Sequence, residues 1–202
     1  MAGSAGSTDR GRGLVLMRGP AAASMRWLRR GPVTVAVHDL GAWTGVTLAE
    51  PAARRGGAAD DPLMVLASRP VPTRRRPALG FFVLEGSAVI TLQSRGSRAG
   101  QRWLFWQPGV GLRRVATLAP LPTAALVAAA GATEPTAPAS LSMLLHTTVG
   151  EPVDLLVAVL DLLGLPGARL LVRPVSGEVI EPDPRLVRRF DEAAANERRG
   201  RR

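Results

Sequence analysis

The chain has 202 residues, of which 46% are hydrophobic, and this is enough for one domain with a buried core. It contains no cysteine, which excludes disulfides, thiolate nucleophiles and cysteine-ligated metal centres. All 26 basic residues are arginine, 16 residues are acidic, and the formal charge is +10. Residues 1–118 hold 17 arginines and six acidic residues, whereas residues 119–202 hold nine and ten. Such a field favours anionic partners, but arginine in solvated loops that only keeps the protein soluble is the preferred explanation.

The first 24 residues are rich in glycine, serine, alanine and arginine, with the short apolar interruption LVLM. Such a segment buries too little apolar surface to offset its ordering entropy, so residues 1–24 are predicted to be a disordered tail. Met17 and Met25 are then alternative start residues to Met1. The chain shows no signal-peptide pattern, and its apolar runs are shorter than the about 20 residues that span a bilayer. A cytoplasmic protein without a membrane span is therefore expected.

The first ordered elements are predicted to be strands. Residues 33–38, VTVAVH, alternate in the period of two that a half-buried strand requires, and residues 42–48 follow after a turn. Residues 63–68, LMVLAS, are predicted as a third strand. The segments at 49–62 and 69–77 are rich in glycine, proline and charge, which predicts loops.

Residues 79–107 carry the clearest local pattern. The apolar runs LGFFVL and AVITLQ are separated by EGS, in which Gly86 supplies the positive φ of a tight hairpin. The run QRWLFWQ follows after a polar loop. This pattern predicts a three-stranded antiparallel meander, and residues 110–118 are a candidate for one more strand.

The second half of the chain favours helices. Residues 122–132 are predicted as a helix closed by glycine, and residues 133–140, TEPTAPAS, as a linker. The strongest helical pattern is EPVDLLVAVLDLLGLPG at 151–167, with proline near its start and glycine after its end. Residues 168–175 and 178–182 are predicted to form a hairpin, and residues 184–198 a final helix.

These elements predict an α+β protein. Its first part is an antiparallel meander with helices packed on one face, and a late β-hairpin and a C-terminal helix follow. A single domain is expected at 25–198, with a subdomain break near 132–140 as the alternative and a basic tail at 199–202. The late segment GEVIEPDPRLVRRFDEAA, residues 177–194, resembles the C-terminal end of actinobacterial type VII secretion chaperones. That resemblance implies a non-enzymatic α+β protein that binds other proteins, and it assigns no site residue.

The run QRWLFWQ places three large aromatic side chains within four residues. In a strand, Trp103 and Phe105 point to one face and Trp106 to the other. This pattern favours a core strand covered on both faces. The alternatives are a face that stacks nucleic-acid bases, with nearby arginines on the phosphates, or an aromatic patch for a protein. The candidate anion or nucleic-acid contacts are Arg74, Arg75, Arg76, Arg102, Trp103, Trp106, Arg113 and Arg114.

The sequence predicts no catalytic, cofactor-binding or metal-ligating residue, and it predicts no cofactor. His38 and Asp39 are adjacent in a strand and point to opposite faces, so they do not form a pair. No nucleophile motif surrounds Ser140. The chain has only two histidines and no cysteine, so its sequence gives little support for a metal site. The glycines at 109–111 lack the residues of a phosphate-binding loop.

We therefore expect a non-enzymatic cytoplasmic protein that binds another macromolecule, with a protein partner as the first expectation. The alternative is a nucleic-acid-binding module in which the arginine clusters and the Trp103–Trp106 strand form one continuous face. A third hypothesis is an enzyme or ligand binder with a cleft between the sheet and the helix at 152–163. The oligomeric state is left open.

Overall fold

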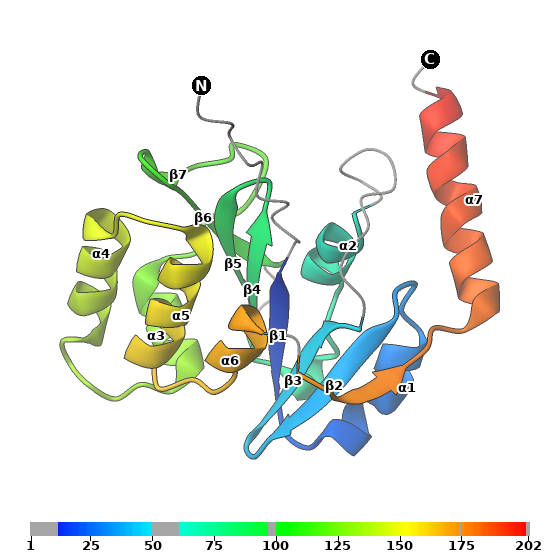
Figure 1. Cartoon of the computed structure of the whole chain (residues 1–202), viewed down its shortest axis with the longest axis horizontal. Coiled ribbons are helices and arrows are strands. Elements are labelled where there is room, and N and C mark those ends of the chain that lie inside the picture. The colour runs from blue at the N-terminus through cyan, green and yellow to red at the C-terminus, as the bar shows by residue number, and fades with distance from the viewer. Residues whose placement is uncertain (1–11, 50–60, 97–99, 174, 201–202) are drawn as a thin grey trace, which may run out of the picture.

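The computed structural model describes residues 12–49, 61–96, 100–173 and 175–200, and its centre is one antiparallel sheet (Figure 1). The strands are β1 (Gly13–Arg18), β2 (Val35–Leu40), β3 (Trp43–Leu48), β4 (Ala78–Leu84), β5 (Ser87–Gln93), β6 (Arg102–Gln107), β7 (Gly111–Arg113) and β8 (Glu178–Ile180). Their order across the sheet is β7-β6-β5-β4-β1-β3-β2-β8. The α+β class predicted from the sequence is confirmed.

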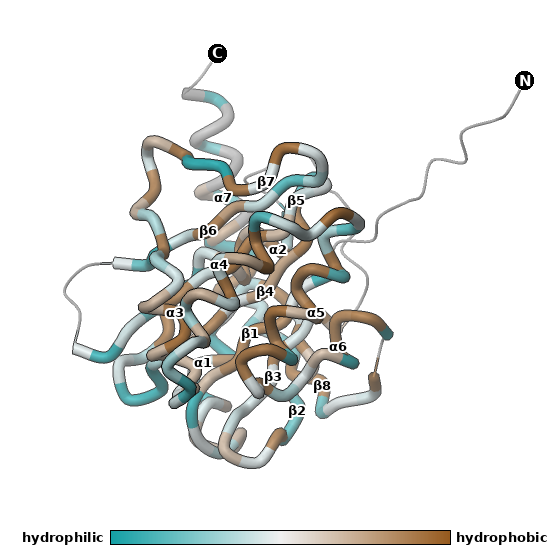
Figure 2. The backbone as a smooth tube through the Cα atoms, turned by 90° about the vertical axis from the view of Figure 1, so that its left-hand side faces the viewer, coloured by the Kyte–Doolittle hydropathy of each residue, from teal (hydrophilic) through white to brown (hydrophobic). Residues whose placement is uncertain are grey.

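Helices lie on both faces of this sheet, whereas the sequence pattern predicted helices on one face. The helices are α1 (Met25–Arg29), α2 (Pro62–Ser68), α3 (Thr123–Ala130), α4 (Ala137–Thr147), α5 (Pro152–Leu162), α6 (Ala168–Val172) and α7 (Pro184–Gly200). One hydrophobic cluster joins the sheet to α3, α4, α5 and α6, and a second joins its other face to α1 and α2. Figure 2 shows hydrophobic residues concentrated along the central strands and α5. Both faces of the sheet are apolar, so each needs a cover.

The predicted disordered tail at 1–24 is wrong for residues 12–24. Strand β1 lies in the middle of the sheet, where Leu16 pairs with Gly45 of β3 and with Leu79 of β4. The side chains of Leu14 and Leu16 enter one hydrophobic cluster, and those of Val15 and Met17 enter the other. Four consecutive apolar residues are enough to order this strand, because both faces of a central strand are buried. Residues 1–11 lie outside the described residues.

The predicted meander is confirmed by strands β4, β5 and β6, and the candidate further strand by β7. Between β4 and β5, Glu85 and Gly86 both have positive φ, 49° and 72°. Two consecutive positive φ angles are those of a type I′ turn, the tight hairpin that the glycine predicted. The predicted strands at 33–38 and 42–48 correspond to β2 and β3.

The strand predicted at 63–68 is wrong, because this segment forms helix α2. Asp61 caps the helix by accepting a hydrogen bond from the backbone N–H of Leu63 at 2.9 Å, and Pro62 occupies the first turn. Leu63, Leu66 and Ala67 are buried, at the spacing of one helical face. The Asp-Pro pair is a helix-start signal, and leucine, methionine and alanine are good helix formers, so the sequence itself favours a helix over the predicted strand.

The helices predicted at 122–132 and 151–167 are confirmed as α3 and α5. The predicted linker is only partly a connection, because its last residues begin α4. The alternative subdomain break near 132–140 falls between α3 and α4, which pack on each other and contribute to one hydrophobic cluster.

The predicted late hairpin is wrong. Its first half is helix α6, and its second half, β8, pairs with β2 through Val35 and Ile180. The C-terminal helix is confirmed as α7, which reaches Gly200 and so includes the first two residues of the predicted basic tail. Residues 201–202 lie outside the described residues.

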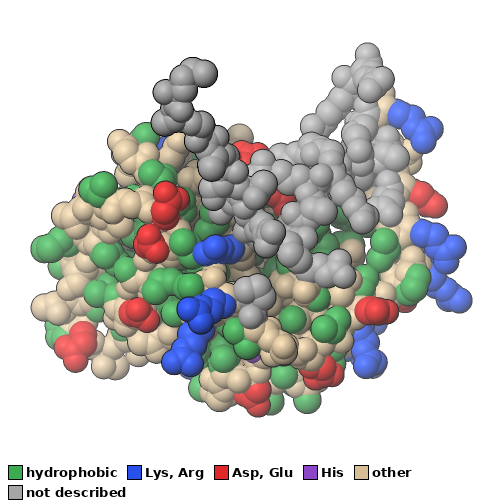
Figure 3. All heavy atoms as spheres, viewed as in Figure 1, with side chains coloured by type: hydrophobic (Ala, Val, Ile, Leu, Met, Phe, Trp, Pro, Cys, Tyr) green, Lys and Arg blue, Asp and Glu red, His purple; other side chains and the backbone are tan. Residues whose placement is uncertain are grey.

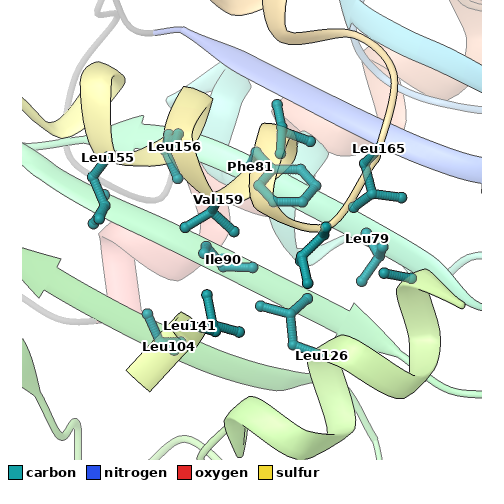
Figure 4. Close-up of a cluster of buried hydrophobic side chains, with 14 of the residues drawn as sticks. Leu79, Phe81, Ile90, Leu104, Leu126, Leu141, Leu155, Leu156, Val159 and Leu165 are labelled. Atoms are coloured by element: carbon teal, nitrogen blue, oxygen red, sulfur yellow. The ribbon is translucent and has the colours of Figure 1, made fainter. Parts of the chain in front are cut away.

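Side chains fill the space between α5 and the sheet, where the third hypothesis expected a cleft. Leu155, Leu156 and Val159 of α5 are fully buried and lie over Phe81 and Ile90 of the meander (Figure 4). Leu126 of α3 and Leu141 of α4 close the same core. Among the described residues, this layer consists of packed side chains and forms the structural core.

Candidate interaction surface at the β7 edge

The two faces of strand β6 have different environments. Trp106 is 1% exposed and lies under the helices of the first face, where its indole N–H donates to the carbonyl oxygen of Leu145 at 3.1 Å. Trp106 is thus a core residue, and its predicted role in nucleic-acid contact is wrong. Trp103 and Phe105 point to the other face, as the strand alternation predicted.

On this second face, Trp103 and Phe105 lie side by side with nearly parallel rings. Their ring centroids are 6.0 Å apart and the planes differ by 9°. Trp103 is 9% exposed and Phe105 is half-buried. The segment after β7 borders them, because the backbone N–H of Trp103 donates to the carbonyl oxygen of Ala119, and that of Leu121 to the carbonyl oxygen of Trp103, both at 2.8 Å.

A small depression opens over these two aromatic rings. Its volume is about 140 Å³, and its lining combines aromatic, aliphatic and guanidinium groups. The lining residues are Trp103, Phe105, Arg113, Arg114, Val115, Ala116, Leu118 and Pro120. The structure therefore brings three of the eight predicted contact residues, Trp103, Arg113 and Arg114, to one place.

Strand β7 forms the border of the sheet next to this depression. It pairs with β6 on one side and is the last strand in the order, so among the described residues its outer backbone groups face no strand. Large apolar side chains are exposed around it: Val110 by 64%, Leu112 by 40% and Val115 by 40%. We name the depression and this border, residues 110–118, the β7 edge surface.

The predicted contact residues of the arginine-rich loop are placed elsewhere. Arg75 is buried, and its Nη1 donates to the carbonyl oxygen of Arg18 at 3.2 Å. Arg76 donates from Nε to the carbonyl oxygen of Val71 at 2.9 Å, which holds the loop closed on itself. Arg74 alone among the three is exposed. These arginines are thus partly structural.

Arg102 is also separated from the depression. It is next to Trp103 in β6, so its side chain points to the opposite face of the sheet, the face of Trp106. The expected continuous face is not formed by the predicted set: Arg102 and Trp106 lie on one side of the sheet, and Trp103 and Arg113 lie on the other.

An aromatic–arginine pair that no sequence pattern predicted lies at Trp27 and Arg69. The guanidinium carbon of Arg69 lies 3.9 Å from the ring centroid of Trp27, and Arg69 Nη2 donates to the carbonyl oxygen of Trp27. Burial lowers the pKa of Arg69 to about 10, so the group stays charged at neutral pH. The two residues are 42 positions apart in the sequence, and nothing local predicts their contact.

The titratable groups of the described residues give no metal centre: no cluster of three or more histidine, aspartate or glutamate side chains is placed to hold an ion. His38 is buried against Thr47, with 3.1 Å between Nε2 and Oγ1, and burial lowers its pKa. His146 is exposed on α4. Within the described part of the chain, no helix has the length and apolar character to cross a membrane.

No family model, curated protein or solved structure matches the chain. The distinguishing feature of the β7 edge surface is the conjunction, at one sheet border, of exposed aliphatic side chains, an aromatic floor and two arginines.

Proposed function

We propose that this chain is a non-catalytic binding protein that holds an extended segment of a partner protein at the β7 edge surface. One observation carries the proposal: Val110, Leu112 and Val115 are exposed around a border strand that lies beside an aromatic depression. Exposed apolar patches mark interaction sites, and a free strand border recognises extended chains through backbone hydrogen bonds.

The partner segment would extend the sheet beyond β7. Its backbone would pair with the outer N–H and C=O groups of Gly111–Arg113, and its alternate side chains would point to the two faces of the sheet. On one face, a partner side chain would lie beside Arg113, which itself pairs with Phe105 of β6. On the other face, Leu112 offers an apolar contact, because it pairs with Trp106 and shares its side of the sheet.

The two arginines contribute charge to this recognition. Arg113 is held in place by a hydrogen bond from its Nη1 to Oε1 of Gln107 at 2.8 Å, and both Arg113 and Arg114 are exposed. A positioned guanidinium binds a carboxylate through charge-assisted hydrogen bonds. We therefore propose a partner segment in which apolar and polar residues alternate and in which a carboxylate lies near one end.

Selection from a random peptide library displayed on phage tests this proposal. Peptides recovered on the wild-type protein should show alternating apolar and polar residues. They should not bind the variants Leu112→Asp and Val115→Asp. Val149→Asp is the matched control, since Val149 is 94% exposed and lies outside the β7 edge surface. Peptides that bind all three variants equally, or a selection that recovers none, would refute the proposal.

Nucleic-acid binding is the second candidate, because the same depression combines aromatic rings with Arg113 and Arg114. The small exposed fraction of Trp103 leaves little ring surface for a base, which makes this the weaker candidate. Titration of mixed-sequence single-stranded RNA at low and physiological salt distinguishes the two. Tryptophan quenching that weakens steeply with salt, and disappears in an Arg113→Gln, Arg114→Gln double variant, would favour RNA over a protein segment.

A further inference from the structure

Two arginine-rich segments meet at one end of the sheet. Residues 69–77, RPVPTRRRP, lead into β4, and residues 93–102, QSRGSRAGQR, run from the last residue of β5 to the first residue of β6. The segments contain four and three arginines, respectively, and no acidic residue. Because Ala78 of β4 pairs with Gln93 of β5, the first segment ends where the second begins. We name these two segments the arginine end; residues 97–99 lie outside the described residues.

Hydrogen bonds join the two segments of the arginine end. The backbone N–H of Val71 donates to Oε1 of Gln93 at 2.7 Å, and Nε2 of Gln93 donates to the carbonyl oxygen of Arg69 at 2.9 Å. Farther from the sheet, Nε of Arg95 donates to the carbonyl oxygen of Arg76. Arginines that are about 20 positions apart in the sequence are therefore neighbours in space.

The guanidinium groups of the arginine end donate to neutral acceptors. Arg76 bonds to the carbonyl oxygen of Val71, and Arg75 bonds to that of Arg18. Arg75 is only 9% exposed, and its buried Nε has no hydrogen-bond partner within the described residues. A carbonyl oxygen holds a guanidinium in place without neutralising its charge, and arginine stays protonated at every physiological pH. These contacts therefore leave the positive charge of the arginine end uncompensated.

The positive charge continues onto the neighbouring strand β1. Arg18 follows Met17, which pairs with Ala78 at the start of β4. The guanidinium carbon of Arg18 lies 3.9 Å from the ring centroid of Trp43, and its Nη2 donates to the carbonyl oxygen of Ala130 at 3.3 Å. In contrast, the basic side chains over α7 and at its base lie among acidic ones (Figure 3). The arginine end differs from that region because its two segments hold basic residues alone.

The accessible side chains of the arginine end are polar. Thr73, Arg74 and Arg95 are exposed, and Arg76 and Ser94 are half-buried. Within the described part of both segments, no large aliphatic or aromatic side chain is exposed. A protein-binding patch or a membrane-inserted surface includes exposed apolar anchors, whereas phosphates are contacted by charged groups and hydroxyls. The composition of this surface therefore favours a phosphate-bearing polymer.

We propose that the arginine end binds the phosphate backbone of a nucleic acid without reading its bases. The guanidinium groups of Arg74, Arg76 and Arg95 would contact phosphates, because a planar guanidinium matches a phosphate through two parallel hydrogen bonds. The hydroxyls of Thr73 and Ser94 would add neutral contacts. With no exposed aromatic ring for base stacking in its described part, the surface should bind independently of sequence. It shares no residue with the β7 edge surface, so this proposal is independent of the one made there.

The test uses the full chain and two fluorescein-labelled DNA duplexes of unrelated mixed sequence. Fluorescence anisotropy measures binding at about 50 mM and about 200 mM salt to wild type and to the double variant Arg74→Gln, Arg95→Gln. The double variant Arg113→Gln, Arg114→Gln is the matched control, since it removes the same charge from exposed positions of the β7 edge surface. Circular dichroism melting curves confirm that each variant is folded.

We expect both duplexes to bind wild type equally, with an affinity that falls steeply as salt is added. Arg74→Gln, Arg95→Gln should lose about tenfold or more in affinity at the lower salt concentration and should show a weaker salt dependence, because phosphate contacts are lost. The control should bind like wild type. Arg74→Lys, Arg95→Lys keeps the charge, so it should recover much of the lost affinity.

Three results would overturn the proposal. The first is no binding of either duplex at the lower salt concentration. The second is an equal loss in the two glutamine double variants, which would assign the binding to net charge alone. The third is a loss confined to Arg113→Gln, Arg114→Gln, which would place the DNA at the β7 edge surface.

Two competitors identify other occupants of the arginine end. Polyglutamate that displaces the labelled duplex as effectively as unlabelled duplex does would indicate an acidic protein segment. Phosphatidylserine vesicles that displace it more effectively would indicate an anionic membrane surface. Either result would overturn the assignment to a nucleic acid, whereas weak displacement by both would support it.

Discussion

The indole N–H of Trp106 donates to the carbonyl oxygen of Leu145 at 3.1 Å, and this bond ties strand β6 to helix α4. It divides the aromatic run of β6 into two roles. Trp106 belongs to the core beneath the helices, and only Trp103 and Phe105 are placed at a surface depression. Phe105, a candidate functional residue, and Trp106, a structural one, are adjacent in the sequence.

Replacing Trp106 with phenylalanine should destabilise the protein without affecting the β7 edge surface. The change removes a buried hydrogen bond and leaves unfilled volume, which together cost about 1–3 kcal/mol in the free energy of unfolding. Urea denaturation followed by circular dichroism measures this loss. Met143→Ala, at a 66% exposed position of α4, is the control and should change stability little. Equal stability of Trp106→Phe and wild type would show that this contact is not important for the core.

Strand β1 should be required for folding, although the sequence pattern placed it in a disordered tail. Leu16 is completely buried in the centre of the sheet, so Leu16→Ala should lower the free energy of unfolding by about 2–5 kcal/mol. Val110→Ala, at an exposed position, should have almost no effect. A chain that starts at Met25 lacks β1 and should give no cooperative unfolding transition. A cooperative transition in that shortened chain would contradict the central position of β1.

The buried amide of Gln93 should hold the arginine-rich loop on the sheet. Its Oε1 accepts from the backbone N–H of Val71 at 2.7 Å, and its Nε2 donates to the carbonyl oxygen of Arg69 at 2.9 Å. Gln93→Leu would leave both backbone groups unpaired, and we expect a loss of about 1–3 kcal/mol with faster trypsin cleavage in the loop. Gln107→Leu, which removes only a bond to an exposed arginine, should leave the cleavage rate unchanged. Wild-type cleavage in Gln93→Leu would mean that the loop is held by other contacts.

The buried His38 should make stability fall in mildly acidic solution. Burial lowers the pKa of His38 below its ordinary value of 6.5, so the unfolded chain takes up a proton at a higher pH than the folded one. The stability that neutral His38 supports is present above about pH 6.5 and is lost as the pH falls through the lowered folded-state pKa. Urea midpoints measured from about pH 8 to about pH 5 should decline less in His38→Gln than in wild type. Parallel declines would exclude His38 as the cause.

Local sequence patterns predicted the elements whose signals are local. The Glu85-Gly86 hairpin and helix α5 follow from turn residues and spacing alone. The incorrect predictions concern segments whose secondary structure depends on tertiary contacts. Residues 63–68 are a short apolar run whose period does not separate a strand from a helix, and burial of one face against β1 and β4 and the cap from Asp61 make them helical. Residues 168–172 likewise form α6, which packs on α5.

The candidate site was predictable only in part, for the same reason. Strand alternation correctly separated Trp103 from Trp106, and proximity in sequence linked Trp103 to Arg113 and Arg114. No sequence signal showed that Arg75 turns inward to the carbonyl oxygen of Arg18, because these residues are 57 positions apart. The hollow lined by Met64 of α2 and Phe190 of α7 could not be predicted either, since residues 63–68 were expected to form a strand.

Amide hydrogen exchange shows whether a partner segment pairs with the border of the sheet at β7. The measurement compares the free protein with the protein saturated by a library-selected peptide, at single-residue resolution. We expect new protection confined to Gly111–Arg113 and their neighbours, together with loss of that protection in Val115→Asp. Protection that appears elsewhere while residues 110–114 exchange as in the free protein would contradict it.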